Sequence, residues 1–336
     1  MSSSPPVSRS ASGPCRTVFS TSLRSQTAID VFESFTVFER TCAQVEFKRL
    51  VFDKPFAAIP QHPEVLAACG IAALGLDHER FLLAPEEGAP QEPMARIAFE
   101  KAGIAKRGVP LVTLDYPPAE TAAIAEVAAR VGATVIARNA SWGAKTGGGD
   151  GRLIYGEGEA AYFHTLPIGL PGRHQVLNAG LAVAMLRFQN RVTVSEAAMQ
   201  AGIAAARWPA RMQRLAPGPV TGTRQVWLDG GHNPQAGAMI GAHFAGQRLH
   251  LVIGMIEGKD PASLIGPLGP TLASITAVPV PGHDWHPASA FGPAARPAPD
   301  VPSALAMIPD DGLPILIAGS LYLAGEVLRL NDELPD

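Results

Sequence analysis

Short apolar runs alternate along this chain with longer segments whose apolar residues recur at helical spacing. The short runs are typical of buried strands, and the longer segments are typical of amphipathic helices. Strands that alternate with helices indicate βαβ units and a parallel sheet. We predict strands at 65–76, 109–114, 134–138, 225–229, 249–253, 274–280 and 314–318, with two more within 153–169. We predict helices at 94–102, 119–131, 172–187, 194–206, 234–245, 260–268, 301–307 and 321–330.

The N-terminal part of the chain follows the pattern less well. Residues 2–29 contain no acidic residue and are rich in Ser, Pro and Arg. That composition is similar to an organellar transit segment, but the prolines and the weak amphipathicity favour a disordered start. Residues 31–52 carry phenylalanines at helical spacing, which predicts a helix there. The Gly-rich segment 143–151 is predicted to be a flexible turn.

Composition excludes several classes of protein. The 336 residues suggest about two domains, and the net charge of −3 without a basic block argues against a nucleic-acid partner. The three cysteines, Cys15, Cys42 and Cys69, stand far apart, which suits a reducing cytoplasm and excludes metal-knuckle spacing. The sequence contains no run of about twenty apolar residues, so we expect no membrane span. The N-terminus lacks the apolar core of a secretory signal. We therefore expect a cytoplasmic protein.

One turn combines a strand end with polar chemistry. The apolar run 226–228 is followed by Asp229, two glycines, His232, Asn233 and Pro234. Glycines allow a tight turn, and Asn before Pro fits the start of a helix. Open α/β sheets bind ligands at such carboxyl ends of strands. The simpler alternative, at roughly even odds on this stretch alone, is an ordinary turn in which Asp and Asn only cap a helix.

Three further patterns predict little. The segment 254–260 has Gly-Lys after a strand, but it is one residue too short for a phosphate loop and has Asp260 where Ser or Thr belongs. The segment 156–161 matches a dinucleotide fingerprint loosely, and its two glutamates would repel a pyrophosphate. His283 and His286 have the spacing of a metal pair, but they lie in a Pro/Gly loop, and we expect them to be exposed.

Six separate motifs together resemble one family, the folylpolyglutamate/dihydrofolate synthases of the Mur ligase superfamily. The resemblance extends over roughly residues 65–330. The motifs are Gly-Leu-Asp-His at 75–78, Phe-Glu-Lys-Ala-Gly-Ile at 99–104, His-Gln-Val-Leu-Asn-Ala at 174–179, Arg-Trp-Pro-Ala-Arg at 207–211, Leu-Asp-Gly-Gly-His-Asn-Pro at 228–234 and Ile-Ala-Gly-Ser-Leu-Tyr-Leu at 317–323.

The resemblance implies an ATP- and Mg²⁺-dependent amide ligase. In that family a substrate carboxylate takes the γ-phosphate of ATP, and the amino group of L-glutamate attacks the acyl phosphate. The implied substrates are dihydropteroate and tetrahydrofolate, and we expect a monomer without nucleic-acid or membrane partners. The implied fold is α/β, with segment 1–29 disordered or degenerate, a partial central ATP-binding domain at 30–208 that lacks the phosphate loop, and a Rossmann-like C-terminal domain at 209–336 with a mainly parallel sheet.

The same resemblance assigns roles to individual residues. It implies that His78 and Lys101 bind metal, Lys101 as a carbamate, and that Lys101 and His232 are catalytic. Nucleotide contacts are implied for Asn178, Arg211, Asp229 and His232. A planar guanidinium such as that of Arg211 suits a phosphate. Each residue also has a simpler interpretation: a histidine at a helix end, a solvated lysine, an arginine paired at a domain joint or a solvent-facing asparagine.

The N-terminal third departs from the family. The phosphate loop, Gly-Thr-x-Gly-Lys-Gly-Ser/Thr, is absent, and residues 21–24 (Thr-Ser-Leu-Arg) are at best a distorted remnant of the metal-binding serine loop. Residues 52–58 stand where the family's acidic metal ligand is expected, whereas 35–39 (Phe-Thr-Val-Phe-Glu) still resembles a family helix. This third therefore looks truncated or scrambled. Since one lost preorganised donor costs about 2.7–4 kcal/mol in a transition state, we expect weak or no turnover.

Two alternatives to this function remain. One is another Mur-type amino-acid ligase, such as a muramyl-peptide synthetase; the ending Gly-Ser-Leu-Tyr-Leu-Ala-Gly-Glu at 319–326 favours the folate branch. The other is a non-catalytic protein that binds nucleotide or folate. Nucleotide binding without turnover would distinguish this second alternative from a ligase.

Overall fold

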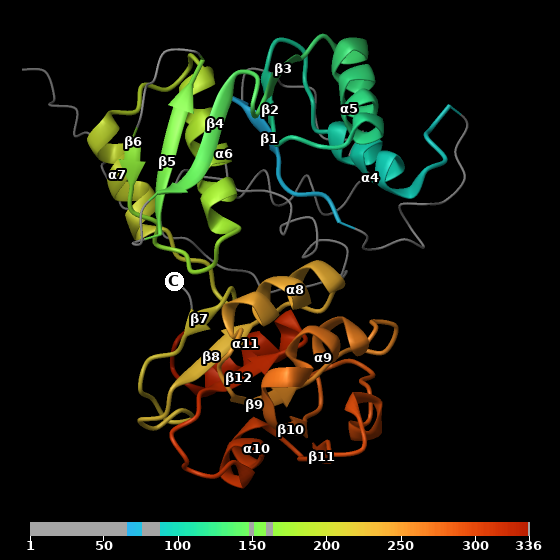
Figure 1. Cartoon of the computed structure of the whole chain (residues 1–336), viewed down its shortest axis with the longest axis vertical. Coiled ribbons are helices and arrows are strands. Elements are labelled where there is room, and N and C mark those ends of the chain that lie inside the picture. The colour runs from blue at the N-terminus through green and yellow to red at the C-terminus, as the bar shows by residue number, and fades with distance from the viewer. Residues whose placement is uncertain (1–65, 76–87, 148–150, 159–163, 335–336) are drawn as a thin grey trace, which may run out of the picture.

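A computed structural model of the chain describes residues 66–75, 88–147, 151–158 and 164–334. The predicted helix at 31–52 and His78 lie outside these residues. Figure 1 shows the described elements in two groups, with β1 to β6 and α4 to α7 in one group and β7 to β12 and α8 to α11 in the other. The domain boundary between 208 and 209 stays a prediction.

A small parallel sheet opens the first group. It contains β1 (Cys69–Ile71), β2 (Pro110–Thr113) and β3 (Thr134–Ala137), in that spatial order. The helices α4 (Pro93–Ala102) and α5 (Pro118–Val131) pack against each other. The α5 helix is followed by the capping residue Gly132, whose φ of 76° is the left-handed conformation that favours glycine at a helix end. These elements match the predicted ones to within a few residues, although β1 is shorter than the predicted strand.

An antiparallel sheet of three strands stands beside it. This sheet contains β4 (Trp142–Gly147), β5 (Arg152–Glu157) and β6 (His164–Leu166), and it is covered by α6 (Gln175–Phe188) and α7 (Glu196–Ala205). The prediction of a flexible turn at 143–151 was wrong, because residues up to Gly147 form β4 and pair with β5. The glycine at 147 serves packing: an added Cβ would lie 2.6 Å from the side chain of Ile154.

The second group contains a six-stranded sheet in the order β11-β10-β9-β12-β8-β7. Only β7 is antiparallel to its neighbour. The mainly parallel α/β prediction is therefore confirmed for this part. Two-residue edge strands such as β7 and β11 are too short for a hydrophobic pattern to predict. The six strands are β7 (Gln213–Arg214), β8 (Val226–Asp229), β9 (Leu249–Ile253), β10 (Leu272–Ala277), β11 (Arg296–Pro297) and β12 (Ile315–Ala318).

Helices cover both faces of this sheet. Ile315 and Ile317 of β12 pack toward one hydrophobic cluster with α10 (Val301–Met307) and α11 (Leu321–Leu330). The alternate residues Leu316 and Ala318 pack toward the other cluster with α8 (Pro234–His243) and α9 (Ala262–Leu268). Since side chains alternate across a strand, a strand with two buried faces reads as a continuous apolar run. This double burial explains why the apolar runs of the sequence predict β9 and β12.

The contact between α8 and α9 depends on a glycine. A Cβ at Gly237 would lie 1.8 Å from the carbonyl oxygen of Ser263. We expect Gly237→Ala to lower the free energy of unfolding by about 1–3 kcal/mol, because the helices must move apart. The control is Gly266→Ala in α9, where an added Cβ meets nothing within 4 Å; that change should raise stability by up to about 1 kcal/mol. Urea unfolding of both variants measures the difference, and equal effects would refute the close contact.

Within the described residues, no helix is both long and apolar enough to span a membrane.

Candidate nucleotide site

The turn after β8 is organised by the carboxylate of Asp229. This side chain is buried, with 5% of its surface exposed. Its Oδ1 accepts a hydrogen bond from the backbone N–H of Gly231 (2.7 Å), and its Oδ2 accepts one from the backbone N–H of Met212 (2.8 Å). Asp229 therefore does not cap the following helix. It joins the turn to the segment that connects the two groups of elements.

That connecting segment has an unusual backbone. Ala210 and Met212 have φ values of 55° and 44°, in the left-handed region that residues other than glycine rarely occupy. Such a conformation persists only where its surroundings hold it. Here the N–H of Gly230 donates to the carbonyl of Ala210 (2.9 Å), in addition to the bond from Met212 to Asp229. We call residues 210–212 the joint.

Arg211 lies in the middle of the joint. Its Nη1 donates to the carbonyl of Ala210 (3.2 Å). A Cβ added at Gly230 would lie 2.2 Å from Cδ2 of Leu321 and 3.3 Å from Nη1 of Arg211, so the glycine makes room chiefly for Leu321 and also for the guanidinium. The joint therefore holds Arg211 against the turn after β8, at the carboxyl edge of the parallel sheet.

His232 and Asn233 complete the turn. His232 is buried, and its Nδ1 lies 3.0 Å from the carbonyl oxygen of Gly230. Because a carbonyl only accepts, Nδ1 carries the proton, and this bond fixes the ring. Asn233 caps α8 by accepting a bond from the N–H of Ala236 (2.8 Å). The capping interpretation of this turn therefore holds for Asn233.

The start of α6 brings a second set of polar side chains. Asn178 donates from Nδ2 to Oε1 of Gln175 (3.0 Å), and Nε2 of Gln175 lies 3.0 Å from Nε2 of His174. This arrangement makes His174 Nε2 an acceptor and the imidazole neutral. Burial lowers the pKa of His174, and the positive charge of Arg211 lowers it further. The start of α6 and the joint are therefore electrostatic neighbours.

The pH dependence of stability follows from His174. Its folded pKa lies below the ordinary value of 6.5, so the unfolded chain binds the proton more readily. The contribution of His174 to the free energy of unfolding is therefore fully present above pH 6.5. It is lost as the pH falls from there through the lowered folded pKa. We expect His174→Gln to flatten this part of the profile of melting temperature against pH.

In Arg211→Ala, the His174 pKa measured by NMR titration should rise. An unchanged pKa would show that the two side chains are not neighbours.

The structure thus brings together some of the predicted residues. Arg211, Asp229 and His232 share the turn and the joint, and a chain of hydrogen bonds runs from Asn178 to His174, whose pKa the charge of Arg211 lowers. Sequence reasoning gave no role to His174 or Gln175, although both lie in the motif that contains Asn178.

The predicted metal site has less support. Lys101 is buried in the last turn of α4, with 8% of its surface exposed. His78 lies outside the described residues. No group of three or more His, Cys, Asp or Glu side chains is placed to hold a metal among the residues that the structure describes. The metal roles of His78 and Lys101, and the catalytic roles of Lys101 and His232, stay predictions.

The expectation that His283 and His286 are exposed was wrong, since both are partly buried. The ring of His283 packs against that of Tyr322, with centroids 3.8 Å apart and the ring planes tilted by 40°. Nε2 of His286 lies 2.7 Å from the carbonyl oxygen of Lys259. The loop that holds them is therefore packed against its neighbours, which Pro and Gly content alone does not predict.

The two α/β groups, with a polar site at the carboxyl edge of the mainly parallel sheet, have an architecture like that of Mur ligases, to whose solved structures the chain aligns. No protein-family model matches the chain. Among curated proteins, it is 29% identical over 279 residues to folylpolyglutamate synthase of Lacticaseibacillus casei, covering 76% of this chain and 60% of that protein. It is 25% identical over 300 residues to dihydrofolate synthetase of Saccharomyces cerevisiae, covering 79% of this chain and 66% of that protein.

Solved structures agree with these relatives. A folylpolyglutamate synthase in complex with AMPPCP and folate aligns with a TM-score of 0.61 and 26% identity, over 78% of this chain and 60% of that one. The neighbours are thus consistently folylpolyglutamate and dihydrofolate synthases, which are ligases, and the resemblance drawn from the six motifs is confirmed. The chain spans less than two thirds of the length of each of these three proteins.

Proposed function

We propose that this chain is an ATP-dependent amide ligase that adds L-glutamate to a folate-class carboxylate. The observation that supports this most is that hydrogen bonds join the joint, which carries Arg211, to the turn after β8 at the carboxyl edge of the sheet. A solved relative of this fold is named as a complex with AMPPCP, an ATP analogue, and folate. Dihydropteroate and tetrahydrofolate are the proposed acceptors, and a cytoplasmic monomer is the proposed form.

The residues of the site fit an adenine nucleotide. The guanidinium of Arg211 offers a planar fork of donors to phosphate oxygens. The amide of Asn178 and the neutral imidazole of His174 offer hydrogen-bonding groups at the start of α6, where backbone N–H groups and the helix dipole favour an anion. The rigid turn from Asp229 to His232 would close the other side of the nucleotide.

The proposed reaction has two steps. A carboxylate oxygen of the acceptor attacks the γ-phosphorus of ATP and releases ADP. The amine nitrogen of L-glutamate then attacks the acyl carbon, phosphate leaves, and the nitrogen loses a proton. Mg²⁺, held by His78 and by Lys101 in its carbamate form, would neutralise charge on the phosphate oxygens. In this reaction, Arg211 would bind the phosphate oxygens and neutralise their charge.

Slow turnover is part of the proposal. The 336 residues contain no Gly-Thr-x-Gly-Lys-Gly-Ser/Thr motif, so the backbone donors and the lysine of that loop are not supplied by this polypeptide. This observation also favours the second candidate, a protein that binds nucleotide or folate without catalysis.

Phosphate release separates the two candidates. We expect release that requires ATP, L-glutamate and dihydropteroate together, at a rate below that of a full-length relative. Omission of any one substrate should reduce release to background. ATP binding with no substrate-dependent release would favour the non-catalytic candidate, and turnover equal to that of the full-length relative would contradict the proposed impairment.

A further inference from the structure

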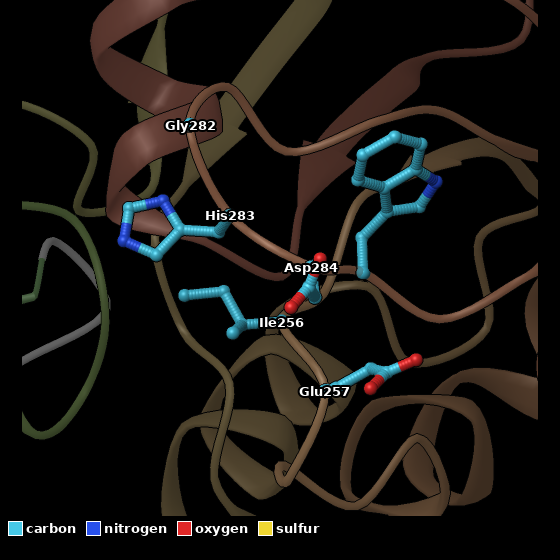
Figure 2. A pocket seen from close by; sticks show the side chains of 6 residues that line it. Ile256, Glu257, Gly282, His283 and Asp284 are labelled. Atoms are coloured by element: carbon cyan, nitrogen blue, oxygen red, sulfur yellow. The ribbon is translucent and has the colours of Figure 1, made fainter.

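A cluster of polar side chains lies at the amino edge of the large sheet, away from the nucleotide site. His250 is the second residue of β9, and Ser274 is the third residue of β10. Figure 2 shows the loops that follow these two strands at the carboxyl edge, with Ile256 in one loop and Asp284 in the other. Since parallel strands run from one edge to the other, the length of the strands separates the cluster from the turn after β8. The proposed ligase reaction uses none of the residues in this cluster.

An irregularity in β10 places Ser274 beside His250. The pairing of β10 with β9 passes from Leu272 opposite Leu249 directly to Ser274 opposite His250, so Ala273 is an extra residue in β10. A β-bulge of this kind re-aims the side chains next to it, and bulges are frequent beside active sites. Because the side chains of paired residues lie on the same face of a sheet, the register shift brings the two polar side chains together.

Hydrogen bonds join Ser274, His250 and Asp311 in one chain. Oγ of Ser274 lies 2.7 Å from Nδ1 of His250, and both carboxylate oxygens of Asp311 lie 3.2 Å from Nε2 of the same ring. A carboxylate only accepts, so Nε2 carries a proton, and Nδ1 of the neutral imidazole accepts the hydrogen bond from the Ser274 hydroxyl. A nucleophile bonded to a base that a third group orients is the arrangement of a nucleophilic catalytic site.

The imidazole is buried, whereas the two groups that flank it reach the surface. The His250 side chain is 4% exposed and that of Asp311 is 41% exposed, while Ser274 is partly exposed. The N–H of Leu313 donates to Oδ1 of Asp311 (3.1 Å), and this bond, together with the one from His250, lowers the pKa of the carboxyl group. Asp311 is therefore a charged acceptor at neutral pH. The backbone N–H of His250 donates to the carbonyl of Pro314 (3.0 Å), which fixes β9 beside the loop that carries Asp311.

The start of β10 is accessible from one side of the sheet. In the part of the chain that the structure describes, β11 pairs with Thr276 and Ala277 of β10, so Ser274 lies beyond the last paired residue on that side. A ligand approaching there displaces no strand. Because Ser274 is only partly exposed, the access suits a small molecule better than a polymer.

We propose that Ser274 is the nucleophile of an acyl-transfer site for small activated esters, with His250 as general base and Asp311 as the positioning residue. Oγ of Ser274 attacks the carbonyl carbon of the ester, and its proton passes to Nδ1 of His250. The bond from the acyl carbon to the leaving oxygen breaks, and that oxygen takes the proton. Water, with His250 again as the base, then attacks the acyl carbon, releases the carboxylic acid and restores Ser274. In both steps the charge of Asp311 stabilises the imidazolium.

Labelling of the full chain with a fluorophosphonate probe tests the nucleophile. The probe forms a bond between a serine Oγ and phosphorus, and fluoride leaves while the serine proton passes to the base. Peptide mass spectrometry of timed samples gives the labelling rate at each serine. We expect Ser274 to be labelled about tenfold faster than Ser289, an exposed serine. His250→Gln should slow labelling of Ser274 by about 100-fold and Asp311→Asn by about tenfold, because the base contributes more than the group that orients it. Asp311→Glu, which keeps the charge, should recover part of the rate.

Asp310→Asn is the matched control, because Asp310 is an exposed aspartate in the same loop. It should leave the labelling rate unchanged. Hydrolysis of p-nitrophenyl acetate tests turnover, and it should fall in Ser274→Ala but not in Ser289→Ala. Since Asp311 lies at the surface, its variants keep the test decisive even where His250→Gln fails to fold.

Three results would overturn the proposal. They are labelling of Ser274 no faster than that of Ser289, a labelling rate that Asp311→Asn leaves unchanged, and ester hydrolysis that Ser274→Ala leaves unchanged. The acyl-transfer site and the ligase site share no residue, so these measurements, made without ATP or glutamate, are independent of the proposed function.

Discussion

Replacing Asp229 by alanine is expected to lower the free energy of unfolding by about 2–6 kcal/mol. The carboxylate accepts from the N–H groups of Gly231 and Met212, and it is buried. Each buried donor that loses its partner costs about 1–3 kcal/mol. The loss should be accompanied by weaker nucleotide binding, because Ala210 and Met212 keep their left-handed backbone only while the joint is held.

Urea unfolding and ATP titration of the same variant measure both effects. Asp300→Ala is the control, because Asp300 is an exposed aspartate that accepts from the N–H of Ser303 and caps α10. Its replacement should cost less stability and leave ATP binding unchanged. If both replacements changed the free energy of unfolding and the ATP affinity equally, Asp229 would be an ordinary turn residue that does not hold the joint in place.

The second large effect is expected at Arg211. Arg211→Ala should weaken ATP binding by about 10–100-fold, because a hydrogen bond to a charged group contributes roughly 1.5–3 kcal/mol. Its Nη1 donates to the carbonyl of Ala210 and lies near Gly230, so the guanidinium is partly ordered before ATP binds. Restoring the charge with lysine should recover only part of the affinity, since an ammonium lacks the planar fork.

Isothermal titration with ATP tests this effect, with Arg214→Ala as the control. Arg214 is an exposed arginine on β7, three residues along the chain. Its removal should leave the affinity unchanged. A similar loss in both variants would indicate a general effect of net charge rather than a specific phosphate contact.

The strands and helices of the C-terminal part could be predicted from the sequence because the strands are buried. The strands β9 and β12 are covered on both faces and therefore appear as apolar runs, and α10 and α11 begin and end at the predicted residues. The strand β4 was missed because glycine is common in turns, whereas here Gly147 allows close packing against Ile154.

The site was only partly predictable. The motif resemblance pointed to Asn178, Arg211, Asp229 and His232, but it gave no reason for the left-handed joint. The left-handed backbone depends on tertiary contacts, because the hydrogen bonds donated by Met212 and Gly230 join segments that are separate in the sequence.

The formation of a glutamyl product tests the proposed function most directly. Dihydropteroate is incubated with the 336-residue chain, MgATP and isotope-labelled L-glutamate, and the products are analysed by mass spectrometry. We expect a labelled adduct that forms only with ATP, forms more slowly than with a full-length relative, and falls further in Arg211→Ala. Absence of any adduct, while ATP still binds, would contradict the ligase function.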